Sequence, residues 1–189
     1  MSIADRIHEA IGKYTNNDLD NALIQVMIAI DGTARKEFPN MKNKNKERFI
    51  NFINDNLDII SKVTFFRFKL NPNDRFNTIG NEEVTFAAFI YNIRCDILHE
   101  WFTKDIIWNE KSLKYQDEKN YIPTSVFLWL IIAVLGSSSN IGERFKNWVW
   151  AHAILEYKDK AIMIPFYQYL WKKEAILELI EKGLWTPNN

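Results

Sequence analysis

The fold is decided by the run Val126-Phe127-Leu128-Trp129-Leu130-Ile131-Ile132-Ala133-Val134-Leu135, ten consecutive apolar residues. A bilayer span needs about 20 such residues, so the run predicts a helix that is buried on every side. Pro123 precedes the helix, which we predict over residues 124–136, and Gly136-Ser137-Ser138-Ser139-Asn140 ends it. Other helices must cover this segment, and the rest of the chain has to supply them.

Three earlier segments repeat apolar residues at helical spacing. Residues 2–14 begin with Ser2, a favourable N-cap residue. Residues 19–34 place apolar side chains at steps of three and four over about five turns, and this helix has to end before Pro39. Residues 49–60 continue the same pattern, so the first third of the chain predicts helices that pack against the buried one.

A further helix is predicted after residues 70–80, which are rich in asparagine and read as a loop. Asn81-Glu82-Glu83 opens this helix, because acidic residues in a first turn interact favourably with the helix dipole. Its apolar stripe extends from Val84 to Trp101. This segment carries the residues on which the functional prediction depends.

The remaining segments are short. In chain order we predict a strand at 105–109, a charged loop or hairpin tip at 111–120, two strands at 153–157 and 160–165 about Lys158-Asp159, and a last helix at 167–182. The sequence therefore predicts a mainly α protein, an up-and-down helical bundle with a short β element toward the C-terminus. No stretch has the composition of a linker, so we expect one domain over 1–189, with a core at about 15–140 and a C-terminal extension at about 141–189.

Composition narrows the functional classes. The 189 residues include 24 basic and 24 acidic side chains, so no global basic field attracts nucleic acid or an anionic membrane. A single cysteine rules out a disulfide framework and a structural zinc cluster and fits a reducing cytoplasm. Six glycines leave no phosphate-cradling loop, which argues against nucleotide-binding enzymes of the P-loop or Rossmann type. No apolar stretch follows Met1 to Arg6 as in a signal peptide, so we expect a cytoplasmic protein without a membrane segment.

Two ionisable side chains, Arg94 and His99, lie five positions apart in a segment that otherwise reads as a buried helix. On a helix this spacing separates them by about 140° and about 7.5 Å, a gap that the long arginine side chain can bridge. A guanidinium and an imidazole suit the attack of a ribose hydroxyl on its neighbouring phosphate. Arg94 and His99 are therefore the candidate catalytic residues.

Four neighbours are candidate supporting residues. Asp96 precedes His99 by three positions and can orient its ring, and Tyr91 precedes Arg94 by three. Asp31 interrupts the apolar face of the helix at 19–34, where it can pair with Arg94 from the neighbouring helix. Glu100 follows His99 directly.

The segment Ile93-Arg94-Cys95-Asp96-Ile97-Leu98-His99-Glu100 resembles the Arg-x4-His motif of the HEPN superfamily. The segment Ala29-Ile30-Asp31-Gly32-Thr33-Ala34-Arg35 is similar to the long helix that pairs with the motif helix in that superfamily, and the likeness covers roughly residues 15–140. The chain departs from many active members at Cys95, where they carry a small polar residue; here the carboxylate comes one position later, at Asp96.

The resemblance implies a four- or five-helix bundle, usually a homodimer in which two motif helices form one cleft. It implies metal-independent cleavage of RNA without a cofactor, in a toxin–antitoxin or defence system with a possible partner protein. In such a site His99 acts as base on the ribose 2′-hydroxyl or as acid to the leaving oxygen. Arg94 binds the phosphate and stabilises the charge that develops on it.

Other interpretations of the same residues stay open. A non-catalytic helical module of the same fold would bind a partner protein or nucleic acid, and a purely structural network would pair Arg94 with Asp31 or Glu100 and His99 with Asp96. Two groups of side chains either bind RNA or serve as solvated loop and core: the basic residues Lys42, Lys44, Lys46 and Arg48, and the aromatic residues Trp148, Trp150, Tyr167, Tyr169 and Trp171. We expect Cys95 to be a buried structural thiol, and neither His8 nor His152 has metal-ligand spacing with His99, so no metal site is predicted.

Overall fold

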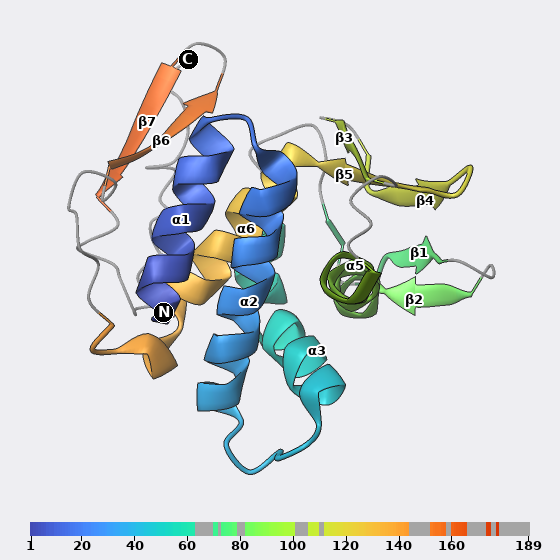
Figure 1. The fold of residues 1–189 in the computed structure, drawn as a ribbon, viewed down its shortest axis with the longest axis horizontal. Helices are drawn as coiled ribbons and strands as arrows, with labels where there is room; N and C mark the ends of the chain where they lie inside the picture. Colours follow the sequence, from blue (N-terminus) through green and yellow to red (C-terminus); the bar gives the residue numbers. More distant parts are fainter. Residues whose placement is uncertain are drawn as a thin grey trace.

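The computed structural model of the chain describes residues 1–62, 70–71, 73–78, 82–100, 106–109, 112–143, 152–157, 160–165, 173–174 and 177, with the backbone alone for 99–100, 152–157 and 160–165. Helices dominate this part of the chain, so the prediction of a mainly α protein is confirmed (Figure 1). No helix in the described ranges is long and apolar enough to cross a membrane.

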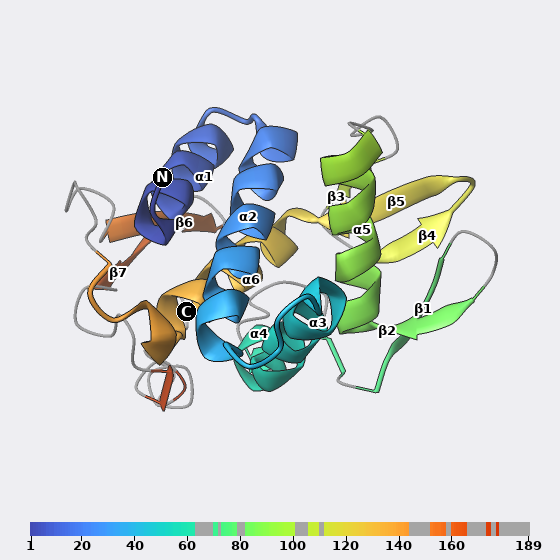
Figure 2. The ribbon, with the colours of Figure 1, turned by 60° about the horizontal axis from the view of Figure 1, so that its bottom comes forward.

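The first two helices, α1 (Ile3–Thr15) and α2 (Leu19–Glu37), form a hairpin and lie side by side in both views (Figures 1 and 2). Ser2 is the N-cap of α1: its side chain accepts a hydrogen bond from the Asp5 N–H at 3.0 Å, and the Asp5 carboxylate accepts one from the Ser2 N–H at 3.0 Å. This reciprocal pair is a capping box, and it confirms the predicted start of the first helix.

The buried helix is α6 (Thr124–Gly136), with the bounds that the sequence predicts, and Pro123 is its N-cap. Eleven of its 13 residues are buried. Helix α2 packs against it, and the ring of Tyr14 at the end of α1 stacks on Phe127 with 4.6 Å between centroids. A helix that is apolar on all sides therefore lies at the centre of the packed helices.

Helix α3 (Asn45–Asp55) packs against both α2 and α5 (Phe86–Glu100), and the short α4 (Leu57–Lys62) packs on α6. The prediction that Asn81-Glu82-Glu83 opens the helix that carries Arg94 is wrong, because Glu83–Thr85 is the strand β2. The helix begins at Phe86 instead, where the Thr85 hydroxyl accepts a hydrogen bond from the Ala88 N–H at 3.3 Å and acts as its N-cap.

Short strands lie along one side of α5 and at the end of the chain (Figure 1). Their bounds are β1 (Arg75–Asn77) and β2 (Glu83–Thr85), β3 (Ile106–Asn109), β4 (Lys114–Gln116) and β5 (Lys119–Pro123), and β6 (His152–Tyr157) and β7 (Lys160–Pro165). The first two form an antiparallel pair, the next three form a sheet in the order β3-β5-β4 with β3 and β5 parallel, and the last two form an antiparallel hairpin.

The strand predictions hold in three places and fail in one. The strand at 105–109, the hairpin within 111–120 and the pair at 153–157 and 160–165 are confirmed, although Asp105, Lys158 and Asp159 lie outside the described residues. The segment 70–80 is not simply a loop, because it contains β1, and β structure is not confined to the C-terminal end. The predicted helix at 167–182 lies outside the described residues except at 173–174 and 177, which are helical.

Helix α5 crosses the first two helices instead of running alongside them. In Figure 1 α5 is seen nearly end-on, whereas α1 and α2 are seen lengthwise, roughly in the plane of the picture. Figure 2 shows α2 on one side of α5 and the strands β1, β2 and β4 on the other. One face of α5 therefore contacts α2 and α3, which is where the residues of the predicted site meet.

Candidate functional site

The Arg94 guanidinium reaches from the middle of α5 to Asp31 on α2. Its Nη2 lies 2.7 Å and its Nε 3.2 Å from the same carboxylate oxygen, Oδ2. The two side chains are only 13% and 16% exposed, so water screens this ion pair much less than it would a surface pair. The predicted contact between Asp31 and Arg94 is confirmed, and the side chain of Glu100 lies outside the described part of the chain.

Tyr91 lies one turn before Arg94, and its ring is close to two cations. The Arg94 Cζ is 5.7 Å and the Lys46 Nζ is 5.8 Å from the centroid of the Tyr91 ring. Phe49 meets the same ring edge-on, with 5.6 Å between centroids. Each cation is therefore within the distance at which the ring quadrupole attracts it.

The protonation of this cluster follows from its surroundings. Burial lowers the pKa of Arg94, but the hydrogen bonds and the negative charge of Asp31 outweigh burial and raise it overall, so the guanidinium stays charged. Burial raises the pKa of Tyr91, and the neighbouring Cys95 raises it further, so the phenol keeps its proton at neutral pH. The site thus offers a fixed positive charge beside a neutral aromatic hydroxyl.

Cys95 is half-buried, and not fully buried as predicted. Its Sγ is 4.0 Å from the Arg94 Nη1, the outer limit for a hydrogen bond to sulfur. The thiol therefore belongs to the surroundings of the arginine, although it contributes only a weak contact.

The other motif residues lie further along α5. Asp96 is half-buried, and His99 and Glu100 occupy the last turn of the helix, where the described part is the backbone. The structure thus brings Arg94, Asp31 and Tyr91 together and places His99 on the same helix, one to two turns beyond them.

The contact of Lys46 with the Tyr91 ring on α5 was not predicted from the sequence. Lys42 and Lys44 are exposed in the loop before α3, and Arg48 donates a hydrogen bond to Asn45. Lys46 alone of the four basic residues has a recorded contact with the cluster, because α3 packs on α5. The only signal in the sequence is that Lys46 comes one turn before Phe49, an apolar residue that has to face the core.

The remaining candidates contribute little to this site. His8 is exposed on α1, and of His152 only the backbone in β6 is described. The side chains of Trp148, Trp150, Tyr167, Tyr169 and Trp171 lie outside the described residues. Across the part of the chain that is described, no three histidine, cysteine or acidic side chains gather in a way that could hold a metal ion.

Comparison with known proteins gives one match. The model of a protein family described as Rv1289 matches residues 2–181. No curated protein and no solved structure matches the chain.

Proposed function

The chain belongs to the Rv1289 family, and from the geometry of its own residues we propose that it is a HEPN-like, metal-independent endoribonuclease. One observation carries the proposal: Arg94 is held in a shielded ion pair on the same helix as His99, with an aromatic ring and a second cation beside it. A charged guanidinium at this depth requires a structural or chemical reason, because burying it costs free energy. Binding of a phosphodiester is the chemical reason that fits these neighbours.

In the proposed reaction, His99 removes the proton from a ribose 2′-hydroxyl, and the 2′-oxygen attacks the adjacent phosphorus. The bond from phosphorus to the 5′-oxygen breaks, and that oxygen takes up a proton from the imidazolium or from water. The products are a 2′,3′-cyclic phosphate and a 5′-hydroxyl. DNA lacks the attacking hydroxyl, so RNA is the substrate.

Arg94 stabilises the negative charge that builds up on the phosphate oxygens. Asp31 is proposed as a positioning residue, since its two hydrogen bonds fix one edge of the guanidinium. At the opposite edge Nη1 lies 4.0 Å from the Cys95 Sγ, and in the proposed complex a phosphate oxygen replaces this weak contact with a stronger hydrogen bond. Lys46, whose Nζ is 5.8 Å from the centroid of the Tyr91 ring, would contact the next phosphate.

The complete site is proposed to form in a homodimer, where two α5 helices approach each other about a two-fold axis. A HEPN-like bundle in which α5 crosses α1 and α2, a cytoplasmic location and a role in a toxin–antitoxin or defence system with a protein partner belong to the same proposal. Their support is the Arg-x4-His motif on α5 and the packing of that helix against α2.

A second candidate function is favoured by the pairing of Arg94 itself. Asp31 accepts hydrogen bonds from two guanidinium nitrogens and offsets the positive charge, which weakens attraction to a phosphate. A helical module that binds RNA or a partner protein without cutting would have the same packing. The two functions differ in their products, so one assay separates them.

The test is cleavage of a labelled single-stranded RNA in the presence of a chelator. We expect the wild-type protein to cut it and to leave a cyclic phosphate, and His99→Ala to slow cutting by about 10²- to 10⁴-fold. The control is His8→Ala, which removes an exposed imidazole on α1 and should leave the rate unchanged. Thermal unfolding of both variants checks that they remain folded.

Three outcomes contradict ribonuclease activity: no product with the wild-type protein, equal rates for the two histidine variants, or cutting of the matching DNA. RNA binding in a gel-shift assay without any product would support the non-catalytic module.

A further inference from the structure

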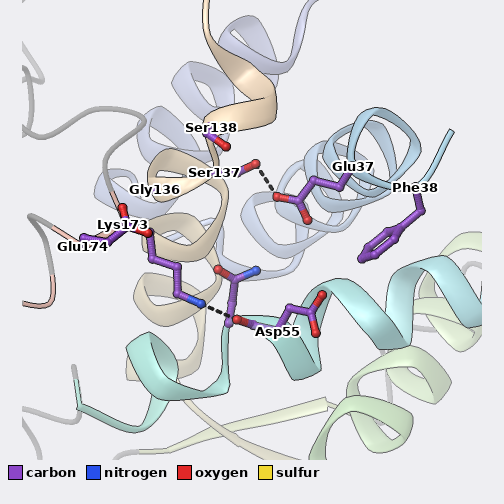
Figure 3. Close-up of a pocket in the computed structure, with 9 residues that line it drawn as sticks. Glu37, Phe38, Asp55, Gly136, Ser137, Ser138, Lys173 and Glu174 are labelled. Carbon is purple, nitrogen blue, oxygen red and sulfur yellow. Dashed lines mark hydrogen bonds between the residues drawn. The ribbon is translucent and has the colours of Figure 1, made fainter.

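A cavity of about 340 Å³ lies away from α5, where the C-terminal ends of α2, α3 and α6 meet (Figure 3). It is lined by Glu37, Phe38, Asp55, Asn56, Gly136, Ser137, Ser138, Lys173 and Glu174. Its volume is at the lower end of the range for small-molecule sites, about 300–1,000 Å³, so a ligand of few atoms would fill it.

Three helices end at this cavity, and each end adds partial negative charge to the lining. Glu37 is the last residue of α2, Asp55 the last of α3 and Gly136 the last of α6, and all three line the cavity. A helix C-terminus carries a partial negative charge of about half an elementary charge from its unpaired carbonyl groups. Two of these ends add a carboxylate to the partial charge, although an acidic side chain is unfavourable at that end of a helix.

The Glu37 carboxylate faces the cavity while tied to α6. The Ser137 hydroxyl donates a hydrogen bond of 2.5 Å to its Oε1, as Figure 3 shows. Burial raises the pKa of Glu37, the Ser137 hydrogen bond opposes this, the charge of Asp55 raises it further, and Lys173 lowers it. The raised pKa means that the Ser137 hydrogen bond and the charge of Lys173 do not fully offset the cost of burying the ionised Glu37 carboxylate.

Lys173 compensates only part of the charge. Its ammonium group donates to the backbone carbonyl of Asp55 and pairs with the Asp58 carboxylate at 2.9 Å. Among the described residues that line the cavity there are three carboxylates, counting the exposed Glu174, and this one ammonium group. The cavity therefore favours a cationic ligand over a neutral or anionic one.

Two observations separate an organic cation from a metal ion. Among the residues that the structure describes, no three acidic, histidine or cysteine side chains cluster closely enough to hold a metal. The Phe38 side chain extends toward the same space in Figure 3, and an aromatic ring can cover an alkyl chain or attract an ammonium group but does not coordinate a hard metal.

We propose that this cavity binds a small organic cation with primary ammonium groups, with Glu37 and Asp55 as its carboxylate contacts and Phe38 against its alkyl chain. The proposal does not rest on the proposed ribonuclease activity, because no residue of the cavity belongs to the cluster around Arg94.

The test is titration calorimetry with 1,4-diaminobutane, with 1,4-butanediol as the uncharged probe of the same length. Two variants remove one charge each: Glu37→Gln, which keeps an acceptor for Ser137, and Asp55→Asn. The matched control is Glu118→Gln, because Glu118 is an exposed acid on the turn between β4 and β5. We expect saturable binding of the diamine at one site, a loss of affinity of about tenfold or more in each cavity variant, and no change in the control.

Several results would overturn the proposal. One is no saturable binding at up to about 10 mM diamine, the range of the weakest specific complexes. A second is an equal loss of affinity in the control variant, which would indicate general charge attraction. A third is tight binding of Mg²⁺ or Ca²⁺ that the two cavity variants abolish, which would assign the cavity to a metal. Thermal unfolding of Asp55→Asn and Glu37→Gln confirms that lost binding is not lost folding.

Discussion

Replacing Asp31 by asparagine, Arg94 by glutamine, and both together measures how strongly α2 and α5 are coupled by their ion pair. Each substitution keeps a polar side chain and removes one charge, although glutamine is shorter than arginine. The single variant Asp31→Asn leaves the shielded guanidinium without its counter-charge. It should therefore lower the free energy of unfolding more than the same substitution does when Arg94 is already glutamine. The coupling energy from the cycle is the quantity of interest.

The structure sets the size of that coupling. Two charges about 4 Å apart at an effective dielectric constant of about 20 attract by about 4 kcal/mol. Desolvation offsets part of this, since the two side chains are only 13% and 16% exposed. Two charge-assisted hydrogen bonds, at 2.7 Å and 3.2 Å, converge on one carboxylate oxygen. We therefore expect a coupling energy of about 1.5–3 kcal/mol.

The assay is urea unfolding of the four proteins at neutral pH, followed by tryptophan fluorescence. Salt should change the coupling only slightly, because a shielded pair is weakly screened. A coupling energy below about 0.5 kcal/mol, the value typical of exposed ion pairs, would refute the argument from burial. The same variants test the positioning role: Asp31→Asn should lower kcat for RNA with little change in KM, whereas a purely structural role would change only the unfolding free energy.

Three further predictions concern charge and backbone conformation elsewhere. Glu37→Gln should raise the free energy of unfolding at pH 7. The pKa of Glu37 is raised in the folded state, so the wild-type protein loses stability as the pH rises above 4.5, the ordinary pKa of a glutamate. In unfolding measured over a pH series, the gain of the variant over wild type should vanish below pH 4.5. Glu143 is the opposite case: burial raises its pKa, but hydrogen bonds from Lys36 and from the Ala4 N–H outweigh burial and lower it. Its stabilisation of about 1 kcal/mol is present above pH 4.5 and lost as pH falls through the lowered pKa, so Glu143→Gln should destabilise the protein at pH 7 and match it in acid, as measured by thermal unfolding at each pH. Glu118→Gly should stabilise the protein by about 0.5–1 kcal/mol in urea unfolding, because Glu118 has φ of +59° in a two-residue turn that favours glycine; a loss of stability would contradict this account of the turn.

Long periodic segments of the fold could be predicted from the sequence, and short ones could not. The apolar run that forms α6 and the spacing that forms α2 each span several turns, so the pattern leaves one interpretation. Strand β1 has three residues, of which only Phe76 is buried, and three residues carry too little periodicity to identify a strand. The start of α5 was misplaced for a related reason, since acidic residues favour a first turn in general but the hydroxyl of Thr85 determines where this helix begins.

The candidate site could be predicted only where one residue type was anomalous on its own helix. Asp31 stands out as an acid on an apolar face, which is why its contact with Arg94 could be expected. Lys46 does not stand out, because lysine is common in loops and its position over Tyr91 depends on how α3 packs against α5. The cavity depends on packing alone, since the helix ends at residues 37, 55 and 136 are far apart in the sequence.

Helix α2 carries a residue of each site, and its geometry keeps the two sites separate. Asp31 and Glu37 are six positions apart, which places them about 9 Å along the helix and about 120° around it. A ligand of the cavity therefore cannot contact the ion pair, and charge changes at the two positions should have additive effects on stability. Both sites also depend on α3, which packs against α2 and α5, contacts Tyr91 through Lys46 and lines the cavity with Asp55. Substitutions that loosen the contact of α3 with α2 should disturb the two sites together, whereas substitutions within either site should not.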